Sequence, residues 1–262
     1  MIPQLTPIST STIEAAVFAA AQQRGGLFDV ATSSEVVLDI GHEVTGRRLR
    51  AVLSDLVERG SAVPLERGRY AIVDGLGRIS PIAMGGFLAP AAYVSLWTAA
   101  DHYRLTTQEV STIAVVTATQ KRPLDSEALG VRFIFHQTTG RRLFGWHEEP
   151  IDGVMACLAD VEKVLIDLLW FGGQAGVPRA AQVMAIWEEG AKLMNPYVLV
   201  DYSNKMASSR LRRRVGYLMD LFGLTGSDGL LDWRSVDRSP VRLFASEAWN
   251  VERSAGRWGV YG

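Results

Sequence analysis

Arginines are concentrated in one short stretch of the chain, where they could bind the phosphates and bases of a nucleic acid. Residues 47–78 contain seven arginines and four acidic residues, a local excess of three positive charges. Residues 1–46 contain one arginine and five acidic residues. Guanidinium groups neutralise phosphates and can form paired hydrogen bonds to guanine. The formal net charge of the whole chain is −1, but the local field decides what a surface binds, and here it favours a nucleic acid.

The first of these arginines stand at the beginning of a helix that we predict over residues 44–59. Its apolar residues have the spacing of one buried helical face: Leu49, Val52, Leu53, Leu56 and Val57. Arg47 then lies on the exposed face, between Arg48 and Arg50 on its two flanks. In a helix-turn-helix, the N-terminal end of the second helix enters the major groove. We therefore predict DNA contacts from Thr45, Arg47, Arg48 and Arg50.

A hairpin is predicted directly after this helix, with strands at residues 61–65 and 69–73. Arg67 and Arg69 flank the glycine of its turn, from which they could reach a neighbouring phosphate or the minor groove. Two earlier helices, at about 10–23 and 32–41, are suggested by capping-box spacings at Ser11 and at Thr32. Helix, short helix, longer helix and hairpin follow the order of a winged helix-turn-helix.

These elements define the predicted architecture, an α+β fold with two domains. Residues 1–75 form a winged-helix DNA-binding domain, and residues 76–262 form a larger mixed α/β domain. Glycine and polar residues at 74–80 are the candidate linker. In the second domain we expect helices at 90–103, 152–171, 179–193 and 196–222, and strands at 110–118, 131–136 and 142–146.

A second basic cluster lies on the helix predicted over 196–222. Leu211, Val215 and Leu218 belong to its buried face, so Arg210, Arg212 and Arg213 are expected to face outward, as a candidate second basic patch. Three interpretations stay open: a solvated helix face, an additional DNA contact, or a docking surface for an acidic or RNA-bearing partner.

Residue patterns for catalysis are absent. A metal-dependent nuclease of the usual kind places an acid or glutamine two residues before a lysine, but the four lysines of this chain are preceded there by Thr119, Val161, Gly190 and Ser203. Neither a glycine-rich phosphate loop nor a G-x-S-x-G turn around Ser95 is present. We expect no catalytic residue and no cofactor, and hence no enzyme.

Two groups of polar residues nevertheless invite a chemical interpretation. Glu162 and Asp167 are five residues apart on one apolar helix, which places them on different faces, so buried polar anchors are favoured over an acid–base pair. The string His147-Glu148-Glu149 lacks the second nearby histidine that a metal site usually has. We therefore expect no metal site.

Cysteine content and hydrophobic patterning indicate the compartment. Cys157 is the only cysteine, which excludes an intrachain disulfide and fits a reducing cytoplasm. We recognise no signal peptide. The apolar runs at 15–21 and 164–171 are far shorter than the roughly 20 residues of a membrane helix. The sequence predicts a cytoplasmic protein without a membrane partner.

Four segments, spread from about residue 10 to residue 225, together resemble the AbiEi-type antitoxins of type IV toxin–antitoxin and abortive-infection systems. Residues 67–72 (RGRYAI) are similar to the family's wing, and residues 92–106 to its "YvSlwsAL…hgLt" segment. Residues 161–167 resemble its "E-x-x-L-x-D" helix, and residues 212–218 its "rrvGYLle" helix. The chain departs from this pattern at Ala100 and at Arg104, where the family usually has leucine and glycine.

This resemblance implies a DNA-binding transcriptional repressor with a second role. The winged helix would bind inverted repeats in double-stranded DNA at the promoter of its own operon. The C-terminal domain, as the antitoxin domain, would counter a toxin of the nucleotidyltransferase class. Two alternatives stay open: a winged-helix module for protein interactions, and a nuclease targeted by a winged helix. Both a monomer and a dimer on DNA are compatible with the sequence.

Overall fold

The computed structural model describes residues 8–73, 79–108, 110–127, 129–230, 239–245, 247–251 and 257–262. It is a mixed α+β fold. The described residues form two compact units. The first holds those up to Leu88 together with Asp125–Val131 and Glu149–Ala156, and the second holds the remainder, beginning at Ala89. The predicted boundary at 75/76 lies outside the described residues. No described helix is both long and apolar enough to cross a membrane.

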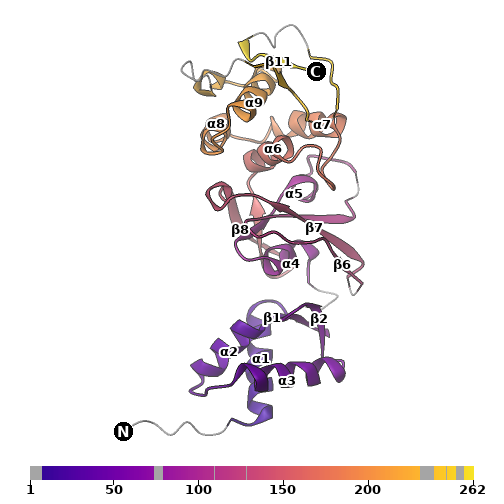
Figure 1. The fold of residues 1–262 in the computed structure, drawn as a ribbon, viewed down its shortest axis with the longest axis vertical. Helices are drawn as coiled ribbons and strands as arrows, with labels where there is room; N and C mark the ends of the chain where they lie inside the picture. The colour runs from indigo at the N-terminus through magenta and orange to yellow at the C-terminus, as the bar shows by residue number, and fades with distance from the viewer. Residues whose placement is uncertain are drawn as a thin grey trace, which may run out of the picture. The chain divides into compact units, whose positions relative to one another are not determined.

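The first unit begins with three helices, α1 (Thr10–Gln23), α2 (Val30–Asp39) and α3 (Gly46–Glu58). Strand β1 (Leu27–Asp29) lies between α1 and α2, and the hairpin β2 (Ala62–Glu66) and β3 (Arg69–Ile72) follows α3 (Figure 1). The three strands form an antiparallel sheet in the order β1-β3-β2. The unit continues with helix α4 (Pro81–Leu88).

Helix positions were predicted well here, but their N-terminal caps were not. α1 is capped by Ser9, whose hydroxyl accepts a hydrogen bond from the Thr12 amide at 3.1 Å. α2 is capped by Asp29, whose carboxylate accepts from the Thr32 amide at 2.7 Å. In each case the cap comes before the serine or threonine that the capping-box spacing had suggested, because an equally good acceptor stands upstream.

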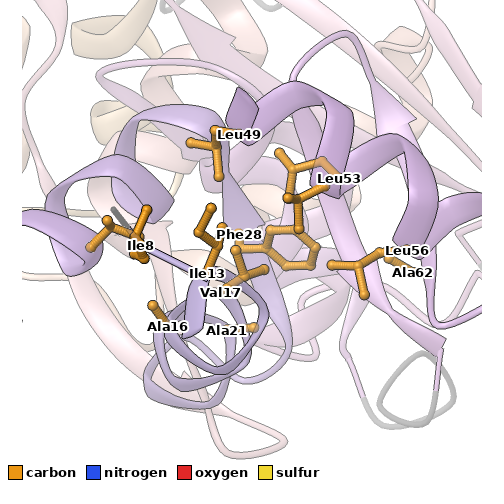
Figure 2. Packing of buried hydrophobic residues seen from close by; sticks show 12 residues of the cluster. Ile8, Ile13, Ala16, Val17, Ala21, Phe28, Leu49, Leu53, Leu56 and Ala62 are labelled. Atoms are coloured by element: carbon orange, nitrogen blue, oxygen red, sulfur yellow. The ribbon is translucent and has the colours of Figure 1, made fainter. Parts of the chain in front are cut away.

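The core of the first unit gathers around Phe28. Ile13 and Val17 of α1 and Leu49 and Leu53 of α3 are completely buried. Figure 2 shows these side chains turned toward the aromatic ring. The predicted buried face of α3 is confirmed for Leu49, Val52, Leu53 and Leu56, while Val57 is half-buried at its edge.

The described residues also form a six-stranded sheet in the order β6-β7-β5-β4-β9-β8. Its strands are β4 (Ala92–Val94), β5 (Thr112–Thr117), β6 (Leu124–Ser126), β7 (Val131–Gln137), β8 (Trp146–Ile151) and β9 (Val154–Ala159). β4 is antiparallel to β5 and parallel to β9, and β5 is parallel to β7. The strand predicted over 142–146 is not found, because a 3₁₀ turn ends at Arg142 and the next strand, β8, begins only at Trp146.

The second unit holds helices α5 (Leu96–His102), α6 (Val161–Trp170), α7 (Ala180–Gly190), α8 (Pro196–Lys205) and α9 (Ser209–Leu221). α6 packs against the other four (Figure 1). A two-stranded parallel sheet joins β10 (Val241–Arg242) to β11 (Val260–Tyr261).

Three of the predicted helices were too long, because each took in a strand or a left-handed residue. The helix predicted over 90–103 begins as β4 and becomes helical from Leu96, whose φ is 57°. The helix predicted over 152–171 contains β9 before α6. The helix predicted over 196–222 is interrupted at Ala207, where φ is 52°. A left-handed residue interrupts a run of helical backbone, and at a residue other than glycine the sequence gives little sign of it.

Candidate nucleic-acid interface

The exposed face of α3 carries the predicted contact residues. Arg47 and Arg50 are exposed, as are Ala51, Ser54 and Glu58 farther along the helix. A Cβ built on Gly46 would lie 3.7 Å from Nη1 of Arg50, so this guanidinium group reaches back toward the first turn. Long helical side chains lean toward the N-terminus in this way. The charges of Arg47 and Arg50 are thereby concentrated at the N-terminal end of α3.

Thr45 begins the helix as its N-cap. Its hydroxyl oxygen accepts a hydrogen bond from the Arg48 amide at 3.3 Å. The other amide groups of the first turn have no intrahelical partner, and the helix dipole adds a partial positive charge there. Thr45 therefore organises an end of the helix that favours a phosphate, which is a different role from a base contact.

Arg48 is already engaged within the protein. Its Nη2 atom donates a hydrogen bond to the backbone carbonyl of Ile8, and Ile8 is 4% exposed in the core of the first unit. The guanidinium group therefore lies against the segment that leads into α1. Sequence reasoning missed this contact because Ile8 and Arg48 are forty residues apart.

The far end of α3 is electrostatically balanced. Arg59 forms ion pairs with Glu14 at 2.6 Å and with Asp55 at 2.8 Å. These pairs neutralise the arginine at the C-terminal end, while Arg47 makes no ion pair or hydrogen bond through its side chain among the described residues. The uncompensated positive charge of α3 is thus at its N-terminal end.

The hairpin turn presents its two arginines differently. Arg67 is exposed, next to Gly68, whose φ is +79°. Arg69 pairs with Glu66, donates to the Leu88 carbonyl at 3.1 Å, and lies 5.8 Å from the ring centre of Phe87. Arg67 can reach solvent or a ligand, whereas Arg69 connects β3 to the last turn of α4.

The second basic cluster is not the outward-facing patch that was expected. Arg210 is exposed, but Arg212 and Arg213 are half-buried. Arg213 donates hydrogen bonds to the carbonyls of Trp258, of Ser239 at 2.7 Å and of Gly259 at 2.9 Å. The expectation for Arg213 was wrong because the C-terminal segment, by which we mean the described residues 239–242 and 257–262, packs over this side of α9 and its backbone carbonyls bind the guanidinium group.

A buried polar cluster connects two of the segments on which the family resemblance depends. Asp167 on α6 is completely buried and pairs with Lys163, which is 1% exposed. The same carboxylate accepts hydrogen bonds from the Tyr93 hydroxyl at 3.1 Å and the Ser95 hydroxyl at 2.9 Å. Burial, and then the charge of Asp167, hold the pKa of Tyr93 well above its usual value.

Glu162 belongs to a separate set of contacts. Its carboxylate accepts a hydrogen bond from the backbone N–H of Asn195 at 2.6 Å, and Asn195 is the residue just before α8. Glu162 and Asp167 therefore have different partners, which agrees with their interpretation as polar anchors. Lys163 was not singled out from the sequence, although its spacing of four from Asp167 is that of a helical ion pair.

The histidines do not assemble a metal site in the described chain. Nδ1 of His147 lies 2.8 Å from Asp160, which also accepts from the Tyr202 hydroxyl at 2.7 Å. His136 is 2% exposed and contacts Gln174 at 3.2 Å, and burial lowers the pKa of its imidazole. Among the described residues, no three His, Cys, Asp or Glu side chains are grouped as metal ligands.

Comparison with known proteins gives a likeness at the level of the fold. No family model matches the sequence, and no curated protein matches it. One solved structure that the chain resembles is that of the RV2827C protein from Mycobacterium tuberculosis, with a TM-score of 0.54 and 13% sequence identity. The match covers 97% of this chain and 92% of the other. At this identity the comparison shows that the two proteins share a fold over nearly their whole length.

Proposed function

We propose that the first unit is a winged helix that binds double-stranded DNA through α3, and that the protein is a transcriptional repressor with an antitoxin role rather than an enzyme. The observation that carries the DNA-binding part is the exposed, uncompensated charge of Arg47 and Arg50 at the N-terminal end of α3. The element order α1, β1, α2, α3, β2, β3 supports the winged-helix interpretation.

The placement of the hairpin adds support. The Gly68 carbonyl accepts a hydrogen bond from the Val30 amide at 3.2 Å, which holds the turn beside the start of α2. Arg67 is exposed in that turn. On a duplex with α3 in the major groove, Arg67 would supply a phosphate or minor-groove contact that is independent of sequence.

Antitoxin action rests on the resemblance of four segments to the AbiEi-type family. Residues from three of those segments have packing roles: Tyr93 and Ser95 bind Asp167, and Arg213 anchors the C-terminal segment. Contact with a toxin would therefore be made by other, exposed residues of the second unit. The proposed partner is a toxin of the nucleotidyltransferase class encoded in the same operon.

Replacing Arg47 with alanine should weaken binding to the protein's own upstream DNA. We expect a loss of about 1–3 kcal/mol if the guanidinium group contacts a base, and a smaller, sequence-independent loss if it contacts a phosphate. Fluorescence anisotropy at several salt concentrations measures both. Arg24→Ala is the matched control. Arg24 is an exposed arginine of the same unit, and it lies at the C-terminal end of α1 and not on α3.

Equal affinity of wild type, Arg47→Ala and Arg24→Ala for the same duplex would contradict contact by α3. A wild-type protein that binds no upstream DNA at any salt concentration would instead favour the alternative of a module for protein interactions.

Co-expression tests the antitoxin half. A nucleotidyltransferase reading frame adjacent to this gene, expressed alone, should arrest growth, and expression of this chain should restore it. The variant Arg47→Ala should restore growth as well as wild type, because the proposed neutralisation uses the second unit. Continued arrest in the presence of soluble wild-type protein would contradict the antitoxin role.

A further inference from the structure

Two of the arginines that the sequence assigns to DNA contact have a feature that the others lack. Arg48, which is exposed, and Arg69, which is half-buried, each bind a backbone carbonyl elsewhere in the first unit. Their exposed neighbours Arg47 and Arg67 make no such hydrogen bond among the described residues. Among the arginines predicted to contact DNA there are therefore two such pairs, Arg47 with Arg48 and Arg67 with Arg69, and in each pair only one member is bonded to the backbone.

The hydrogen bond of Arg48 connects the first turn of α3 to the residues that precede α1. Ile8 is packed in that core, where Figure 2 shows it near the start of α1. Its carbonyl accepts from Nη2 of Arg48, the third residue of α3. Because the core side of α3 is fixed by Leu49 and Leu53, this hydrogen bond adds a constraint at the turn of the helix that leads toward the duplex.

Arg69, in the hairpin, is likewise held by a backbone carbonyl of another element. One guanidinium group binds the Glu66 carboxylate and the Leu88 carbonyl, and it lies over the ring of Phe87. Leu88 and Phe87 form the last turn of α4, and Leu88 is completely buried. The hydrogen bond and the ring contact fix β3 against α4 beside the turn that carries Arg67.

We propose that Arg48 and Arg69 are positioning residues, and that recognition of the duplex falls to Arg47, Arg50 and Arg67. This inference rests on the proposed DNA-binding function. Arg48 holds the leading end of α3 in place for Arg47, and Arg69 holds the hairpin in place for Arg67. A guanidinium group that is bound to the protein's own backbone would have to break that contact before it could present its full set of donors to a base.

Four single variants separate the two roles: Arg47→Ala, Arg48→Ala, Arg67→Ala and Arg69→Ala. Each removes one positive charge, so any difference between them reflects what the side chain contacts. A residue that contacts phosphate changes the slope of log affinity against log salt by about 1. We expect this change for Arg47→Ala and Arg67→Ala, with unaltered melting temperatures. For Arg48→Ala and Arg69→Ala we expect the melting temperature to fall by about 2–4 °C or more, with a weaker affinity and an unaltered salt slope.

The melting temperature is measured without DNA, so it tests the inference separately from the proposed function. Equal melting temperatures within each pair would overturn the positioning role even if all four variants bound DNA. A decrease in salt slope of about 1 for Arg48→Ala at wild-type melting temperature would overturn it as well. Absence of DNA binding by the wild type would refute the proposed function, while the melting contrast would still decide whether these arginines are anchors.

Discussion

Replacement of Asp167 with alanine is expected to destabilise the protein by about 3–5 kcal/mol, because it leaves the buried ammonium group of Lys163 without its partner. The hydroxyl groups of Tyr93 and Ser95 lose their acceptor at the same time. Domains are commonly stable by only about 5–15 kcal/mol, so this change removes much of the free energy of unfolding. Urea denaturation followed by circular dichroism measures it.

A paired variant separates the charge from the packing. Lys163→Met with Asp167→Leu removes both charges and keeps most of the volume, and such replacements are often neutral or stabilising. We expect this double variant to be more stable than Asp167→Ala. A loss below about 1 kcal/mol for Asp167→Ala, the magnitude typical of exposed pairs, would contradict the buried arrangement of this cluster.

Replacement of Gly216 with alanine is expected to displace the C-terminal segment from α9. A Cβ at this position would lie 2.2 Å from two ring atoms of Trp258, a side chain that is 1% exposed. Overpacking of this kind typically costs about 1–3 kcal/mol. The hydrogen bonds from Arg213 to the same segment would be strained as well. Urea denaturation and limited proteolysis should show lower stability and faster cleavage of the C-terminal segment.

The clash itself is tested by removing its other partner. Trp258→Ala creates a cavity that an alanine at 216 does not fill, but it removes the ring that the new methyl group meets. Gly216→Ala should therefore cost much less in the Trp258→Ala background than in the wild type, and the two effects should be far from additive. Additive losses would show that Gly216 is needed for another reason.

The parts of the fold that sequence reasoning predicted are those governed by local pattern. The buried face of α3 follows from the spacing of Leu49, Val52, Leu53 and Leu56, and the structure confirms it. The residues of β4 and β9 were predicted to be helical, because a short run of apolar residues has no periodicity that distinguishes a strand from a helix. The left-handed backbone at Leu96 and Ala207 left no mark in the sequence, since neither residue is glycine.

The contacts that individual polar side chains make depend on partners that are distant in the sequence. Arg47 and Arg48 are adjacent and chemically identical, yet only Arg48 lies close enough to the Ile8 carbonyl to donate to it. Arg213 was expected to face outward because nothing near it in the sequence indicates the carbonyls of Trp258 and Gly259. The acceptor of Ser95 is likewise 72 residues away, on α6. Such contacts follow from tertiary packing and cannot be read from residue type and spacing.

The most direct test of the central claim is photocrosslinking from the exposed face of α3 to DNA. A benzoylphenylalanine side chain introduced at Ala51, which is exposed beside Arg47 and Arg50, should crosslink to the protein's own upstream duplex. The same side chain at Gln22, an exposed position on α1, serves as the control and should not. Crosslinking from Gln22 but not from Ala51, in protein that binds the duplex, would contradict recognition by α3.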